Sequence, residues 1–237
     1  MSKTAHICIF SKPAVPGSVK TRLIPMVGAI TAAKLAEAFF LDTWSAVRQI
    51  TWAKTVIAST DPQAVASIGR DAEVWPQGEG DLGDRIERIL RRALARAPLA
   101  IALGADAPGL PPRLIEKARI MLVGVADAVL GPSADGGFYL LGMRKCPPGI
   151  LAGLPWSREH TFVSTLSRLR NAGLKVRVLE PWFDVDQPQD LLKLARLLAA
   201  GIVTAPCTAS VLRKLTVEAF HSKPAVAHET ISHYSSS

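Results

Sequence analysis

The sequence is poor in the residues that build disulfide frameworks and zinc sites. Its 237 residues include three cysteines, Cys8, Cys146 and Cys207, which are far apart and form no CxxC pair. An odd number of widely separated cysteines indicates neither a disulfide framework nor a zinc site. The five histidines are also scattered. A histidine-based metal centre is therefore not expected.

Long apolar runs and aromatic residues are scarce as well. No run approaches the roughly 18 apolar residues of a membrane span, and the apolar N-terminal stretch is too short for a signal peptide. We therefore expect a soluble, cytoplasmic protein without a membrane span. Aromatic residues make up 6% of the chain, and it contains no helix-turn-helix, zinc finger or RNP-type box. The net charge of +8 is thus better matched to an anionic small molecule than to nucleic acid.

What the chain does have is an alternation of strand-like and helix-like segments. This alternation predicts βαβ units, a mixed but mainly parallel sheet with helices on both faces, and ligands at the carboxyl edge of that sheet. We expect a single α/β domain over residues 1–203. Residues 204–237 are expected to form a C-terminal extension whose last part, 222–237, is a flexible tail. The expected strands are 6–10, 54–59, 73–75, 99–103, 126–130, 138–143 and 175–179, and the longer helices are 30–50, 82–97, 112–123, 156–170 and 190–200.

A basic loop follows the first predicted strand. The segment from Lys12 to Leu23 carries three cations together with glycine and proline, and it precedes a helix-like stretch. Cations and free backbone N–H groups at a strand end are typical of a site for nucleotide phosphates. The segment is neither a Walker A motif nor GxGxxG. An ordinary strand-to-helix loop with solvated side chains is the alternative. The residues expected to contact phosphate are Lys12, Gly17, Lys20, Thr21 and Arg22.

Carboxylates follow three of the later strands. Asp106 comes directly after an apolar strand, where it could bind a divalent cation or cap a helix. Asp135 precedes Gly136 and Gly137, which either allow a ligand to approach the backbone or form a hairpin turn. Near Pro188, Asp186 can be explained as a helix cap. Asp184 has no such role and is the better candidate ligand, although the choice between the two stays open.

As an ordered set, these motifs resemble a family of bacterial GT-A-fold transferases. The set comprises KP…G…KTRL, QGEGDLGDR, GADAP, GPSADGGFYLLG, PWS and DVDQPQDL, and it runs from about residue 6 to about residue 200. The family is similar to molybdenum-cofactor and phospholactate guanylyltransferases, and its members are usually labelled glycosyltransferases. Gln187, where threonine is usual, and Ala105, where serine or threonine is common, depart from the pattern.

The resemblance implies a Rossmann-like nucleotide-diphospho-sugar transferase fold that binds a nucleotide and Mg²⁺ or Mn²⁺. Asp106 and Asp184 would be the metal ligands, and Lys20, Arg22, Asp106 and Asp135 the catalytic residues. The polar segment 77–85 would form a mobile wall over the nucleotide. That wall supplies the further expected binding residues Leu82, Gly83 and Arg85, and the later hairpin supplies Gly136 and Gly137.

Three functions are compatible with these residues. In a nucleotidyltransferase, a phosphate of a small-molecule acceptor attacks the α-phosphorus of a nucleoside triphosphate and pyrophosphate leaves. In a glycosyltransferase, an acceptor hydroxyl attacks the sugar carbon of a nucleotide sugar. Several cations in one loop fit a triphosphate better, and the strand-end motif has a single aspartate rather than DxD, so nucleotidyl transfer is favoured. A nucleotide-binding regulator without activity is the third reading.

Overall fold

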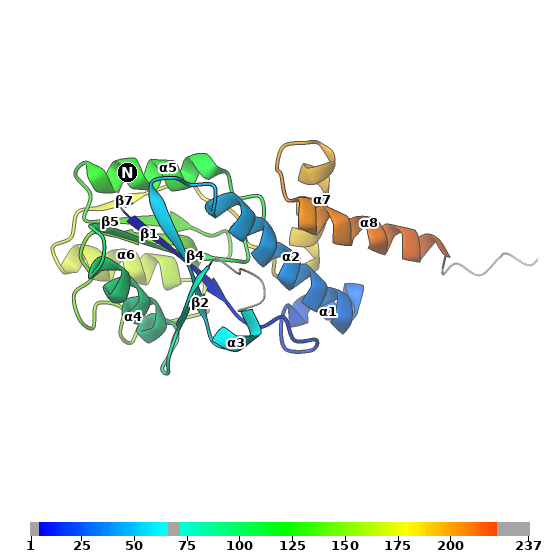
Figure 1. Ribbon diagram of the computed structural model, residues 1–237, viewed down its shortest axis with the longest axis horizontal. Coiled ribbons are helices and arrows are strands. Elements are labelled where there is room, and N and C mark those ends of the chain that lie inside the picture. The colour runs from blue at the N-terminus through cyan, green and yellow to red at the C-terminus, as the bar shows by residue number, and fades with distance from the viewer. Residues whose placement is uncertain (1–4, 66–71, 222–237) are drawn as a thin grey trace, which may run out of the picture.

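The computed structural model describes residues 5–65 and 72–221 as an α/β sandwich (Figure 1). Its sheet has seven strands in the order β3-β2-β1-β4-β6-β5-β7. β6 pairs antiparallel with β4 and β5, whereas the other pairings are parallel. The expected mixed, mainly parallel sheet is confirmed. The strands are β1 (Ala5–Ser11), β2 (Ala53–Ser59), β3 (Glu73–Pro76), β4 (Leu99–Gly104), β5 (Ala128–Pro132), β6 (Phe138–Met143) and β7 (Val176–Val178).

Helices cover both faces of the sheet because both faces of its central strands are apolar. α2 (Ala29–Val47) and α5 (Pro112–Val123) pack on one face, with Phe40 and Ile115 in the same buried cluster as Ile7. α4 (Leu82–Leu94) and α6 (Thr161–Asn171) pack on the other face, where Ile89 and Leu169 join a second cluster. The short elements are η1 (Thr21–Leu23), α1 (Ile24–Val27) and α3 (Pro62–Val65).

A third apolar cluster joins α2 to the last two helices, α7 (Pro188–Ala199) and α8 (Pro206–His221). Figure 1 shows α8 beside α2. The hydrophobic pattern weakens beyond residue 204, and the sequence did not predict α8. The predicted tail at 222–237 lies outside the described residues. At the start of α8, the buried carboxylate of Asp42 on α2 accepts hydrogen bonds from the backbone N–H groups of Cys207 (2.8 Å) and Thr208 (2.9 Å). This helix cap comes from a residue far away in the sequence.

One predicted helix begins later than expected. The sequence predicts a single helix over 156–170, but α6 begins at Thr161. Ser157 has a φ of 58°, a left-handed conformation that a regular helix does not contain. The Thr161 hydroxyl donates to the carbonyl of Pro155 at 2.6 Å and closes residues 155–161 into a turn. The prediction was wrong here because local hydrogen bonding competes with helix formation.

An ion-pair network stabilises the edge strand β3. The Glu73 carboxylate accepts hydrogen bonds from Lys54 Nζ (2.5 Å), Trp75 Nε1 (2.6 Å) and Arg96 (2.8 Å). The Arg92 guanidinium lies 4.2 Å from the centre of the Trp75 ring. These donors, above all Lys54, lower the pKa of Glu73 from 4.5 to about 2. A carboxylate with a lowered pKa stabilises the fold above its unfolded-state pKa, and this contribution is lost as the pH falls towards the folded-state value.

Glu73→Gln is therefore expected to lower the free energy of unfolding at pH 7 by about 1 kcal/mol. The deficit should shrink between about pH 4.5 and pH 2, because the wild-type protein loses the same charge over that range. Urea unfolding at a series of pH values measures the effect, with the exposed Glu37→Gln on α2 as the control. A deficit independent of pH would show that the Glu73 charge does not contribute.

Candidate functional site

A buried ammonium group joins two carboxylates at the carboxyl edge of the sheet. Lys20 Nζ lies 2.7 Å from Asp106 Oδ1 and 2.7 Å from Asp186 Oδ1. The Lys20 side chain is 5% exposed, whereas those of Asp106 and Asp186 are 56% and 38% exposed. One side chain thus connects the loop after β1, the loop after β4 and the segment before α7. We call Lys20, Asp106, Asp184 and Asp186 the charged cluster.

The local backbone directs Lys20 into this position. Its φ of 46° and ψ of 41° are left-handed, which costs a non-glycine residue roughly 1–2 kcal/mol. The carbonyl of Lys20 accepts a hydrogen bond from Leu23 N at 2.8 Å and begins the turn η1. The ammonium also lies 5.6 Å from the centre of the Phe39 ring on α2. Strained backbone of this kind persists only where surrounding contacts compensate for it, and here the carboxylates do so.

The two carboxylates keep Lys20 protonated in spite of its burial. Desolvation by burial, the largest single influence, lowers the pKa of Lys20. The charges of Asp106 and Asp186 and their hydrogen bonds together outweigh it and raise the pKa above 10.5. A buried lysine without partners would lose its proton more readily. Lys20 is therefore a fixed positive charge within the cluster.

Asp184 lies beside this pair and has a different environment. Its Oδ2 accepts a hydrogen bond from the Ser133 hydroxyl at 2.6 Å. Burial raises the pKa of Asp184 to about 7. The negative charges of Asp106, Asp135 and Asp186 add to the rise, and the bond from Ser133 opposes it. Four carboxylates thus share one region with the buried ammonium of Lys20.

Backbone contacts bring these segments together. The N–H of Val185 donates to the carbonyl of Asp106 at 2.9 Å, and Ser133 forms a parallel bridge with Trp182. The sequence left open whether Asp184 or Asp186 is the relevant residue, and the structure places both at the cluster. Asp186 was explained as a helix cap, which is wrong, because its carboxylate accepts from Lys20. Gln187 is the N-cap of α7, and Asp190 in the first turn accepts from the N–H groups of Gln187 (2.8 Å) and Asp186 (3.2 Å).

The hairpin around Asp135 combines the two roles that the sequence allowed. Asp135 Oδ1 accepts from Gly137 N at 3.0 Å, which is the turn interpretation. Its negative charge also contributes to the raised pKa of Asp184, so the carboxylate lies within electrostatic range of the cluster. Gly136 has a φ of 88°, and a Cβ there would lie 2.0 Å from the carbonyl oxygen of Glu159. Only glycine fits at this position.

The remaining residues of the basic loop are largely exposed. Lys12, Gly17, Thr21 and Arg22 lie at the surface between β1 and α1. Within the residues that the structure describes, Lys12 and Arg22 form no ion pair. Their charges are therefore available to an anion from solvent, in contrast to the charge of Lys20.

Hydrogen bonds hold the segment 77–81 against the same edge of the sheet. The buried Gln77 side chain donates to the carbonyls of Ser11 (3.1 Å), the last residue of β1, and of Ala58 (2.9 Å), the last but one of β2. Arg88 donates to the carbonyls of Gln77 and Glu79. Gly78 has a φ of 75°, and a Cβ there would meet the Arg88 guanidinium at 2.7 Å. In this conformation Gly78 and Gly80 allow the side chains of Arg88 and Asp84 to pack closely on the backbone. The motion predicted for this wall stays a prediction.

The residues expected on this wall do not all lie near Lys20. Leu82 is 42% exposed at the start of α4, and Gly83 is buried under Trp156. Arg85 Nε donates to the carbonyl of Gly80 at 3.0 Å. α4 covers the face of the sheet opposite to α2, over which Lys20 lies. The structure therefore brings the loop 77–81 to the ends of β1 and β2 but does not bring Arg85 into contact with Lys20.

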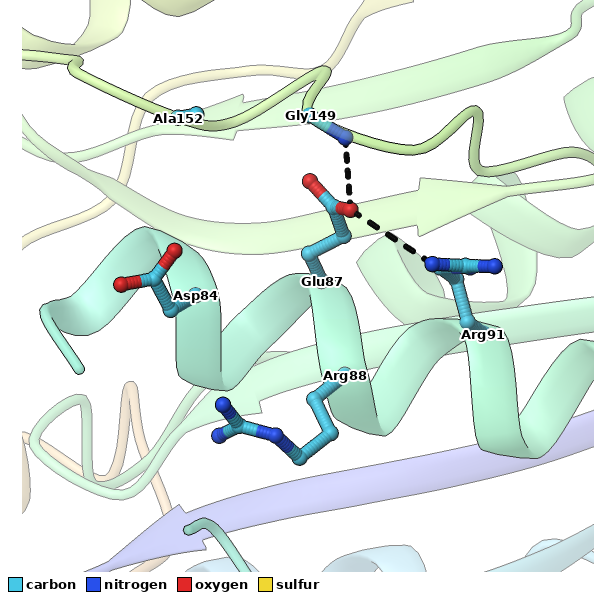
Figure 2. Close-up of a pocket in the computed structure, with 6 residues that line it drawn as sticks. All are labelled: Asp84, Glu87, Arg88, Arg91, Gly149 and Ala152. Carbon is cyan, nitrogen blue, oxygen red and sulfur yellow. Dashed lines mark hydrogen bonds and ion pairs between the residues drawn. The ribbon is translucent and has the colours of Figure 1, made fainter. Parts of the chain in front are cut away.

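A hollow of about 550 Å³ lies elsewhere, between α4 and residues 149–152 (Figure 2). Figure 2 shows Glu87 directed at Gly149 and Arg91, while Arg88 points away from them. Glu87 accepts from Gly149 N at 2.8 Å and lies 4.0 Å from Arg91. The charged side chains that line the hollow already have partners within the protein, and among the described residues the lining includes none of the charged cluster.

Sequence reasoning missed three residues of this region as site residues. Gln77 and Ser133 stand in the quoted motifs, directly after β3 and β5, and this position was the available signal. Arg88 lies within a helix rich in arginine, where nothing distinguishes it from a solvated charge.

The charged cluster offers the oxygen ligands that Mg²⁺ and Mn²⁺ prefer. The crowding of Asp106, Asp135, Asp184 and Asp186 is of the kind that a divalent cation relieves. The position between Asp106 and Asp186 is occupied by the Lys20 ammonium. Among the residues that the structure describes, no group of three or more histidine, cysteine, aspartate or glutamate side chains is arranged to hold a metal ion. A cation between Asp106 and Asp184 therefore stays a prediction.

Within residues 5–65 and 72–221, no helix is long and apolar enough to cross a bilayer. No curated protein matches the chain. Among solved structures, a "putative nucleotide-diphospho-sugar transferase" from Desulfovibrio desulfuricans G20 is 30% identical. The alignment covers 92% of this chain and 96% of that one, with a TM-score of 0.82.

More distant structures share the fold. CMP:2-keto-3-deoxy-manno-octonic acid synthetase complexed with CTP is 17% identical, with a TM-score of 0.54 over 84% of this chain and 99% of that one. 4-Diphosphocytidyl-2C-methyl-D-erythritol synthase is 13% identical, with a TM-score of 0.56 over the same shares. Together with the sheet order, these likenesses establish the expected nucleotidyltransferase and GT-A type of fold. Residues 41–158 match the family described as "Uncharacterized protein conserved in bacteria (DUF2064)", and the chain belongs to this family.

Proposed function

We propose that this protein is a metal-dependent transferase that moves a nucleotidyl group from a nucleoside triphosphate to a phosphorylated small-molecule acceptor. The observation that carries the proposal is the charged cluster. It lies at the carboxyl edge of the sheet, where α/β proteins bind ligands, and next to a loop with two exposed cations. In this reaction, an acceptor phosphate oxygen attacks the α-phosphorus, the bond from the α-phosphorus to the bridging oxygen breaks, and pyrophosphate leaves.

The exposed cations suit the triphosphate. Lys12 and Arg22 would bind its phosphates, and the backbone at Gly17 and Thr21 would supply N–H donors. Asp106 and Asp184 would hold Mg²⁺ or Mn²⁺, which neutralises phosphate charge and stabilises the leaving group. Asp135 and the glycine backbone at 136–137 would face the acceptor.

Lys20 has a specific place in this proposal. In the described conformation it neutralises Asp106 and Asp186, so the cluster carries less negative charge. A metal-bound triphosphate would bring a divalent cation to the carboxylates and phosphate anions to Lys20. Lys20 would then contact the phosphates while keeping Asp186 as its carboxylate partner.

The distant neighbours support nucleotidyl transfer, because two of them are named as enzymes of cytidine nucleotide chemistry and one holds CTP. A second candidate is glycosyl transfer from a nucleotide sugar. The specific observation in its favour is the name of the 30% identical relative, a "putative nucleotide-diphospho-sugar transferase".

A thermal-shift panel of nucleoside triphosphates and nucleotide sugars, each with and without Mg²⁺ or Mn²⁺, tests the proposal. A ligand that binds only the native state raises the melting temperature. We expect a larger shift with a triphosphate and metal than with either alone, followed by pyrophosphate release when phosphorylated acceptors are added. A shift confined to nucleotide sugars would favour glycosyl transfer. Binding without turnover of either class would favour a regulator.

Arg22→Ala is expected to weaken triphosphate binding by at least about 1.5 kcal/mol, the scale of one charge-assisted hydrogen bond. Because Arg22 is exposed and forms no ion pair with a described residue, its removal should leave the melting temperature unchanged. Lys20→Ala should lower both affinity and melting temperature. The melting temperature should fall because Asp106 and Asp186 lose their partner. Isothermal titration calorimetry with the exposed Lys34→Ala as control measures the difference. Equal affinity in wild type and Arg22→Ala would remove the phosphate role.

Asp106→Asn is expected to abolish the metal-dependent part of triphosphate binding while changing the apo melting temperature little. The variant loses one bond to Lys20, but it also removes a charge that contributes to the raised pKa of Asp184. The two effects on stability therefore oppose each other. Calorimetry with and without Mg²⁺ gives the readout. Undiminished metal dependence in Asp106→Asn would contradict the ligand assignment.

A further inference from the structure

We infer that Val203, in the segment between α7 and α8, is a positioning residue for Asp106. The inference rests on the proposed function in one respect, namely that Asp106 is a ligand of the metal. It gives α8 and the segment before it a part in the geometry of the site, although no residue of α8 belongs to the charged cluster.

The first step is the contact between Val203 and Gly109. Gly109 has a φ of 76°, and a Cβ built on it would lie 2.9 Å from Val203 Cβ and 3.2 Å from Cγ2. Val203 is 7% exposed. Its isopropyl group therefore lies directly on the Gly109 backbone, three residues beyond Asp106. Any side chain at position 109 would have to displace Val203.

The second step is that the turn carrying Asp106 is held between two contacts. On one side, the carbonyl of Asp106 accepts from Val185 N at 2.9 Å. On the other side, Val203 covers Gly109. Between them, Leu110 N donates to the carbonyl of Ala107 at 3.1 Å and closes the turn. The carboxylate of Asp106 projects from this clamped turn at 56% exposure and contacts Lys20 Nζ at 2.7 Å, so the backbone of the turn and the ion pair together set its position.

The third step is that Val203 is itself fixed at both ends of its segment. On the α7 side, Ile202 N donates to the carbonyl of Leu197 at 2.9 Å. On the α8 side, Asp42 binds the N–H groups of Cys207 and Thr208, and the Thr208 hydroxyl donates to Asp42 Oδ2 at 2.6 Å. Asp42 is 5% exposed, and Thr208 is fully buried. The hydrogen bonds between Asp42 and the start of α8 thus fix one end of the segment in which Val203 contacts Gly109.

The fourth step concerns the third apolar cluster, to which Val203 belongs. It also contains Leu23, three residues after Lys20, and Phe183 and Val185, which flank Asp184. All three segments that meet at the charged cluster are therefore supported from the same apolar core. Loss of volume at Val203 acts on the Asp106 segment first, because the three atoms nearest to a Cβ built on Gly109 all belong to Val203.

Amide hydrogen exchange of the apo protein tests the inference without any ligand. In Val203→Ala, the Val185 and Leu110 amides should exchange about tenfold faster than in the wild type, because local opening is favoured. Val211→Ala is the matched control, since Val211 packs on the same cluster from α8 itself. Equal protection of both amides in the two variants at matched global stability would overturn the inference. If Val203→Ala fails to fold, amide exchange is compared between Val203→Ser and Val203→Thr, since threonine keeps the shape of the valine side chain and serine does not. We expect the Val185 and Leu110 amides to exchange faster in Val203→Ser than in Val203→Thr. Equal exchange in these two variants overturns the inference.

Mn²⁺ binding, followed by electron paramagnetic resonance, gives a readout that a purely structural role would not move. We expect roughly tenfold weaker Mn²⁺ binding in Val203→Ala, the scale of an outer-shell change at a metal site, and no change in Val211→Ala. Equal Mn²⁺ affinity in the two variants overturns the link to the site. If the wild type binds no Mn²⁺ or nucleotide while the exchange difference is present, the proposed function fails and the positioning of the turn stands.

Discussion

The arrangement of this site depends on one interaction, the contact of the buried Lys20 ammonium with Asp106 and Asp186. Burying a charge is costly unless partners in good geometry compensate, and removing one partner leaves the other uncompensated. Two distances of 2.7 Å meet that condition and also offset the left-handed backbone at Lys20. The same contact lowers the net negative charge around Asp184, where burial and neighbouring carboxylates already raise the pKa to about 7. Without Lys20, the carboxylates would repel one another in the absence of a cation.

The rest of the fold brings the partners of Lys20 to one place. Parallel strands deliver the loops after β1 and β4 to the same edge, and the antiparallel β6 carries the chain back so that the later segment with Asp184 returns to it. The apolar cluster beyond this edge, which α2 shares with α7 and α8, supports all three segments. The C-terminal helix is thus part of the domain that holds the site, because Asp42 caps it and Val203 packs on Gly109.

Sequence patterns predicted the features that depend on neighbouring residues. The apolar runs of β1, β2 and β4 and the strand-end position of Asp106 are local signals, and they located the sheet and the edge at which the charged cluster lies. The partner of Lys20 lies 166 residues away at Asp186, and no local pattern indicates such a pairing. α8 was missed for the same reason, since its first turn is stabilised by Asp42 from another helix. The prediction that the helix begins before Thr161 was wrong, because the hydrogen bond from the Thr161 hydroxyl to the Pro155 carbonyl forms a turn where the hydrophobic periodicity predicted a helix.

A double-mutant cycle between Lys20 and Asp106, measured as the free energy of urea unfolding of the apo protein, tests the central claim most directly. Lys20→Met keeps the aliphatic stem but removes the charge, and Asp106→Asn keeps the shape of the carboxylate. We expect Lys20→Met to destabilise the protein less in the Asp106→Asn background than in the wild type, with a coupling energy of at least about 1 kcal/mol. Additive effects, with no coupling beyond about 0.3 kcal/mol, would contradict a structural role for this ion pair.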